Sequence, residues 1–242
     1  IIRPHRLATK RGPSMFSRAA LCKRYLDHAE QFTEHAMFRA LEAGRSDAAG
    51  YDAFLRRVAL THLHRPRIVA FLRSIAPAEV VDRLRLDLLE PIQLDRNGLD
   101  RPSPLEAMLI VSRIGRELPV LRAQAQEEFD AVVADPRPYA TPMDLGFATL
   151  IEAVAFEFML DRIGRRICDF LQRHRGLPKY ALCWFNRASN SSRAAHGLND
   201  ILTYAECYRD RLAALDEIVD AALGENVFVK RYFGWRALPS EV

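Results

Sequence analysis

The chain has 242 residues, of which 49% are hydrophobic and 27% are charged, and its formal net charge is +4. This profile is typical of a globular protein with a substantial core and excludes disordered and fibrous chains. Its 35 basic residues are nearly matched by 31 acidic ones along every segment. Such mixed charge indicates solvated helix faces and argues against nucleic-acid binding.

The start of the chain and the cysteines bear on organisation and location. Residues 1–16 are basic and lack the apolar run of a signal peptide, so we expect a flexible arm there and a single domain over 17–242. The four cysteines are far apart and show no CxxC spacing. Reduced thiols in a cytoplasmic protein are therefore expected, without a zinc site or a disulfide framework.

The first half of the chain reads as helices separated by proline and glycine. Apolar residues at helical spacing predict one helix over 17–43, which Gly44 ends as a C-cap. A second helix is predicted over 47–75, and Pro66 should kink or break it.

Two further helices are expected before the middle of the chain. A short one should run over 77–90. Ser103 and Glu106 then form a capping box, which predicts a helix over 104–133 with a break or kink at Pro119.

The clearest helix runs from Thr141 to Arg175. Thr141 is a good N-cap, Pro142 suits the first helical position, and Asp144 places a carboxylate in the positive first turn. The residues that follow are apolar on nearly every side, which predicts a helix buried within a bundle. Three carboxylates interrupt this run, so it does not read as a membrane span: Glu152, Glu157 and Asp161.

The end of the chain completes an all-helical pattern. A short aromatic piece over 180–185 precedes a long helix over 192–223, which Gly224 ends. Only 227–229 resembles a strand. The sequence therefore predicts an all-α, single-domain bundle of about seven helices.

Three segments resemble a known family. Glu34–Arg45 (EHAMFRALEAGR) and Tyr51–Arg57 (YDAFLRR) are similar to the opening helices of heme-oxygenase-like proteins, and Leu84–Glu90 (LRLDLLE) is similar to a ligand-bearing helix end. Within that superfamily the chain looks closest to the iron-containing diiron oxidases and oxygenases. The resemblance implies that Glu90 and Glu157 supply carboxylate ligands to iron.

The histidine motif of that family, HxxxDxxH, is incomplete in this chain. If His196 is its last histidine, Ser189 and Arg193 replace the other two ligands; if His196 is the first, Asp200 fits but Thr203 replaces the final histidine. The loop after Glu90 also lacks the histidine that the family places there. The resemblance therefore implies iron held by Glu90, Glu157, His196 and Asp200, with His35 or His62 as replacement ligands.

Each of these residues also has a structural explanation. Glu157 and Asp161 are four residues apart on one helix face, and Arg165 continues that face, so an ion pair is an alternative to metal binding. His196 and Asp200 are likewise four apart and suit two ligands, or a histidine with its supporting carboxylate, or a solvated face. His62 is expected to lie inward as a core histidine, and His64 is expected at the surface or at a kink.

Three functions remain open on the sequence. The first is an iron-dependent oxidase or oxygenase that acts on a small organic substrate in a cavity of the bundle, as a homodimer. The second is a member of the family without metal that serves as a binding or partner subunit. The third is a heme-binding heme oxygenase, in which His28 or His35 would bind the heme iron, although the glycine-rich helix that such proteins need is missing. The catalytic residues are not predicted.

Overall fold

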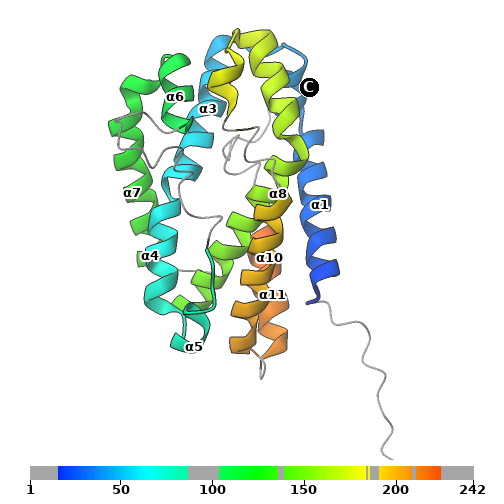
Figure 1. Cartoon of the computed structure of the whole chain (residues 1–242), viewed down its shortest axis with the longest axis vertical. Helices are drawn as coiled ribbons and strands as arrows, with labels where there is room; N and C mark the ends of the chain where they lie inside the picture. Colours follow the sequence, from blue (N-terminus) through cyan, green and yellow to red (C-terminus); the bar gives the residue numbers. More distant parts are fainter. Residues whose placement is uncertain are drawn as a thin grey trace, which may run out of the picture.

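We describe a computed structural model of the chain, which covers residues 16–86, 104–135, 139–183, 185, 191–208 and 211–224. The described residues form a bundle of helices gathered around α8, and they contain no strand (Figure 1). The prediction of an all-α fold is confirmed. The positions at 1–15, Glu90 and 227–229 lie outside the described residues.

The described part of the chain contains ten α-helices. Their bounds are α1 Arg18–Glu34, α2 Ala36–Glu42, α3 Ala48–Leu63, α4 Arg65–Ile75, α5 Ala78–Val81, α6 Pro104–Val111, α7 Leu118–Ala134, α8 Pro142–Arg175, α10 Ser191–Ala205 and α11 Leu212–Leu223. Three short 3₁₀ helices connect them: η1 Gly115–Glu117, η2 Lys179–Leu182 and η3 Glu206–Tyr208.

Helix α8 begins and ends where the sequence predicts. The Thr141 hydroxyl accepts a hydrogen bond from the Asp144 amide at 3.1 Å, and Pro142 occupies the first turn. Gly176 ends the helix in the left-handed conformation, with φ of 63°, as helix C-caps favour. Local signals alone therefore define both ends of the longest helix.

Helix α8 is the centre of the core, as its apolar surface predicts. It packs against α1, α4, α10 and α11. Buried side chains surround its first half, whereas Asp161, Arg165 and Asp169 form an exposed stripe along its second half. Rings from three other parts of the chain contact Phe147 near its start: Phe16, Tyr204 and Tyr208. Near its end, rings from α2 and α3 contact Phe170: Phe38, Tyr51 and Phe54.

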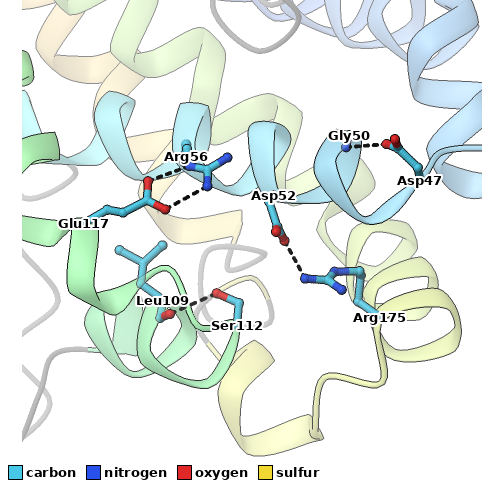
Figure 2. A network of polar contacts seen from close by, with 8 residues as sticks. All are labelled: Asp47, Gly50, Asp52, Arg56, Leu109, Ser112, Glu117 and Arg175. Atoms are coloured by element: carbon cyan, nitrogen blue, oxygen red, sulfur yellow. Dashed lines mark hydrogen bonds and ion pairs between the residues drawn. The ribbon is translucent and has the colours of Figure 1, made fainter.

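Ion pairs join α3 to its neighbours at one end of the bundle (Figure 2). The Arg175 guanidinium at the end of α8 binds Asp52 on α3. The Arg56 guanidinium, one turn further along α3, donates two hydrogen bonds of 2.6 and 2.7 Å to the Glu117 carboxylate of η1. Planar two-point pairing of this kind fixes orientation as well as distance.

The prediction of about seven helices is wrong, because several expected helices are divided. The helix expected over 17–43 breaks at His35, whose backbone is extended and whose ring nitrogen accepts a hydrogen bond from the Met37 amide at 3.3 Å. His35 thus caps α2 and starts a new direction. Gly44 ends α2 with φ of 72°, as expected.

The two proline breaks are also displaced. Pro66 and Pro119 lie in the first turns of α4 and α7, where the missing amide hydrogen has no cost. The breaks themselves precede these prolines, at His64 and between Ser112 and Glu117. Proline therefore begins both helices instead of interrupting them.

Two expected helices are shorter than predicted. The helix over 77–90 ends at Val81, and Leu86 has a left-handed backbone with φ of 53°. The helix over 192–223 ends at Ala205, and α11 begins at Leu212. None of the described helices combines the length and apolar character that a membrane crossing requires.

Candidate functional site

Three of the predicted ligands, Glu157, His196 and Asp200, lie on α8 and α10, which pack against each other in antiparallel directions. The Tyr208 hydroxyl donates to the Asp144 carboxylate at 2.7 Å near the start of α8, and Tyr204 stacks on Phe147 one turn further along. Arg193, at the start of α10, then meets Glu157 near the middle of α8. His196 and Asp200 lie on α10 between these contacts.

Glu157 is buried and lies beside a cation. Its side chain is 1% exposed, and its Oε2 lies 3.6 Å from Nε of Arg193. The alternative to metal binding was an ion pair with Arg165 on the same helix, but the cation at this distance comes from α10. Arg193 also stands where the resemblance would place a ligand, and a guanidinium beside a carboxylate competes with a metal ion for it.

Asp161, one turn after Glu157, is exposed. Partial burial, and secondly the negative charge of Glu157, raise the pKa of the Asp161 carboxyl. The two carboxylates therefore repel one another along α8, and the positive charge of Arg193 lies beside Glu157.

Asp200 binds backbone, and the interpretation of its helix face as solvated is wrong for this residue. Its side chain is 1% exposed in the folded chain. One oxygen accepts the Arg85 amide at 3.0 Å, and the other accepts the Leu86 amide at 2.9 Å. Both oxygens thereby hold the left-handed turn at Leu86 against α10.

His196 lies beside the same turn. Its Nε2 is 3.4 Å from the Arg85 guanidinium. His196 and Asp200 thus both contact the segment that leads toward Glu90, but Glu90 itself lies outside the described residues.

The two proposed replacement ligands each have a structural role. His35 caps α2, as described above. His62 is 8% exposed on α3 and packs against the Phe156 ring at 4.8 Å between centroids, which agrees with its expected role in the core.

The described residues do not by themselves fit an iron site. Within the described ranges, no group of three or more histidine, cysteine, aspartate or glutamate side chains is placed to hold a metal. The two oxygens of Asp200 already accept backbone amides, and Glu157 faces Arg193. An iron site therefore depends on Glu90 and on release of these contacts.

A pocket between α3, α4, α7 and α8 was not predicted. It measures about 180 Å³, and its lining combines four apolar side chains with polar ones from α3, α7, α8 and the junction of α3 with α4. The apolar part is Leu60, Ile68, Phe129 and Val132. The polar part is Arg57, Thr61, His64, Glu128 and Thr149.

The polar wall of this pocket is centred on Glu128. His64 Nε2 lies 3.3 Å from one Glu128 oxygen, and the Gln124 amide donates to the other at 2.8 Å. The Arg57 guanidinium is 3.9 Å from the same carboxylate. The spacing of Arg57, Thr61 and His64 on one helix face was visible in the sequence, but their partner on α7 was not.

Thr61 and Thr149 contribute hydrogen-bond acceptors to the pocket. Each hydroxyl already donates to a carbonyl of its own helix, that of Arg57 at 3.0 Å and that of Gly146 at 2.8 Å. A hydroxyl that has donated its hydrogen retains lone pairs. The polar wall therefore favours a ligand that donates hydrogen bonds.

His28, a candidate heme ligand, is buried on α1 with 5% exposure. Burial, and secondly the nearby Arg24 charge, lower the pKa of His28 from 6.5 to about 4. The neutral ring is thus the form that the folded chain accepts.

We expect this burial to make the protein sensitive to acid. Between pH 6.5 and 4 the unfolded chain binds a proton at His28 and the folded chain does not, so the free energy of unfolding falls as the pH falls. The loss at pH 5 should be about 2 kcal/mol. Urea unfolding at pH 7 and pH 5 checks this, since a His28→Gln variant should lose less stability over that interval than the wild type. An equal loss in both proteins would contradict it.

Comparison of the chain with models of known families, with curated proteins and with solved structures gave no match in any of the three. The heme-oxygenase-like resemblance therefore stays a prediction.

Proposed function

We propose that this chain binds a small organic molecule in the pocket between α3, α4, α7 and α8. The observation that carries the proposal is that apolar side chains and hydrogen-bond acceptors line the same pocket. Ligand sites in proteins combine these two features. This proposal agrees with the second of the three functions that the sequence leaves open, a protein without metal that serves as a binding subunit.

The size of the pocket limits the ligand. A cavity of about 150 Å³ holds one benzene ring, and this pocket measures about 180 Å³. A single-ring molecule with a hydroxyl group fits both the volume and the acceptors.

Binding of phenol and anisole tests the proposal by ligand-observed NMR. Phenol should bind more tightly than anisole, which cannot donate a hydrogen bond. Val132→Phe should weaken phenol binding at least about five-fold, because the larger side chain fills part of the pocket.

Val120→Phe is the matched control, since Val120 lies on the same helix with 67% exposure. It should leave phenol binding unchanged. Absence of phenol binding, or equal affinity of the wild type and Val132→Phe for phenol, would contradict the proposal.

The competing proposal is the iron-dependent oxidase or oxygenase, in which Glu90, Glu157, His196 and Asp200 would hold iron. It is supported by the meeting of α8, α10 and the segment before Glu90. Elemental analysis of the purified protein separates the two: about two irons per chain would favour the oxidase, and absence of iron would favour the binding protein. A Soret band with added heme would instead favour heme binding. The homodimer and the cytoplasmic location stay predictions, which light scattering and cell fractionation test.

A further inference from the structure

A second site, on different helices, begins at the end of α6. Arg113 has a left-handed backbone with φ of 64°. Its amide donates to the Ile110 carbonyl at 3.0 Å, and the Ile114 amide donates to the Leu109 carbonyl at 2.9 Å. These two bonds define a Schellman cap, whose left-handed position normally holds glycine.

This turn has a glycine two residues after the left-handed position, at Gly115. A Cβ added at Gly115 would lie 2.9 Å from the Ile110 Cα, so the close approach of η1 to α6 requires glycine there. Arginine at 113 has no such packing reason, because its side chain is exposed. Arg113 thus holds a left-handed backbone that glycine would adopt at lower cost, and packing of its side chain does not offset that cost.

Arg113 and Arg116 together leave an excess of positive charge. Within the described part of the chain, neither forms an ion pair, and both are exposed. The two nearby carboxylates are engaged by other arginines: Glu117 by Arg56, as Figure 2 shows, and Glu106 by Arg122. The positive charge of Arg113 and Arg116 is therefore not compensated by their acidic neighbours.

The two arginines border an open groove of about 650 Å³. Among the described residues its lining is Ile110, Arg113, Gly115 and Arg116. Ile110 is 56% exposed and places an apolar surface beside the two guanidinium groups.

We propose that this groove binds an organic anion. A carboxylate or phosphate would lie between the guanidinium groups of Arg113 and Arg116, which match the geometry of such oxygens. The apolar part of the molecule would cover Ile110. This site goes beyond the pocket at His64 and does not depend on it.

A purely structural role for Arg113 makes the opposite prediction. A cation at a helix C-terminus interacts favourably with the helix dipole. If that is its only role, Arg113→Gly removes a stabilising charge and changes no binding. If Arg113 binds a ligand anion, Arg113→Gly relieves backbone strain and weakens anion binding.

Titration calorimetry at low salt with phenyl phosphate, benzoate, inorganic phosphate and benzyl alcohol tests the site. Phenyl phosphate or benzoate should bind and should lose affinity in the arginine variants, whereas any binding of benzyl alcohol in the pocket at His64 should be unchanged by those variants. Whichever of these two anions binds more tightly identifies phosphate or carboxylate as the preferred group, and inorganic phosphate should bind more weakly than phenyl phosphate. Arg113→Gly and Arg116→Ala should each weaken anion binding at least about ten-fold.

Arg73→Ala, at an exposed arginine on α4, is the matched control and should change anion affinity less than two-fold. Arg113→Gly should also unfold at the same urea concentration as the wild type or a higher one. Equal losses in the Arg73 and Arg113 variants, an equal effect of Arg113→Gly on benzyl alcohol and on benzoate, or a less stable Arg113→Gly with unchanged anion binding would overturn the proposal. Arg116→Ala decides the matter if Arg113→Gly does not fold.

Discussion

Replacing Asp200 with alanine is expected to lower the free energy of unfolding by about 3–5 kcal/mol. The variant removes the acceptors for two amide hydrogens, those of Arg85 and Leu86. Leu86 is buried, so water does not readily replace the lost hydrogen bond. Asp200→Asn keeps one acceptor oxygen and should lose less, about 1–3 kcal/mol.

Urea unfolding followed by circular dichroism measures this effect. Asp27→Ala is the control, because Asp27 pairs with Lys23 on an exposed surface and should contribute at most about 1 kcal/mol. The Asp200 effect should be the same with and without a metal chelator. A loss for Asp200→Ala below that of the control, or one that disappears in chelator, would contradict the backbone-anchoring role.

The parts of the fold that the sequence predicts correctly rest on neighbouring residues. Thr141, Pro142 and Asp144 define the start of α8 within four positions, and Gly176 defines its end. Each acts on the backbone beside it, so the sequence carries the whole signal. The apolar surface between them likewise predicts a helix at the centre of the core.

The helix breaks were harder to place because a residue can have two local meanings. Pro66 and Pro119 were interpreted as interrupting helices, but each lies in a first turn, where proline is equally suited. His35 breaks its helix through a side-chain bond to the Met37 amide. Histidine is an uncommon N-cap, so its pattern did not predict the break.

The candidate sites depend on contacts between distant parts of the chain. The sequence indicates that Glu157 lies on an inward face, but it does not show that Arg193 approaches from α10. It places His64 on a helix, but not against Glu128 on α7. Helical spacing determines which residues share one face, whereas the packing of helices determines which faces meet.

The pairing of Glu157 with Arg193 leads to the second large effect. Arg193→Met keeps an apolar stem of similar length and removes the cation 3.6 Å from a carboxylate that is 1% exposed. Breaking a buried ion pair from one side costs about 3–5 kcal/mol. Because the Arg193 side chain is 18% exposed, we expect the lower end, about 3 kcal/mol.

The double variant Glu157→Gln with Arg193→Met distinguishes an ion pair from a metal ligand. If Glu157 serves mainly as the partner of Arg193, removing its charge should restore at least about 1 kcal/mol to the Arg193→Met protein, because no carboxylate then stays buried without this cation. Arg24→Met provides the control, since its partner Asp220 is 67% exposed and the pair should contribute at most about 1 kcal/mol. If Glu157 instead binds iron, Glu157→Gln should lower the iron content of the purified protein and should restore no stability. Unfolding free energies and iron analysis of the wild type, the two single variants and the double variant therefore decide whether the buried carboxylate pairs with Arg193 or binds iron.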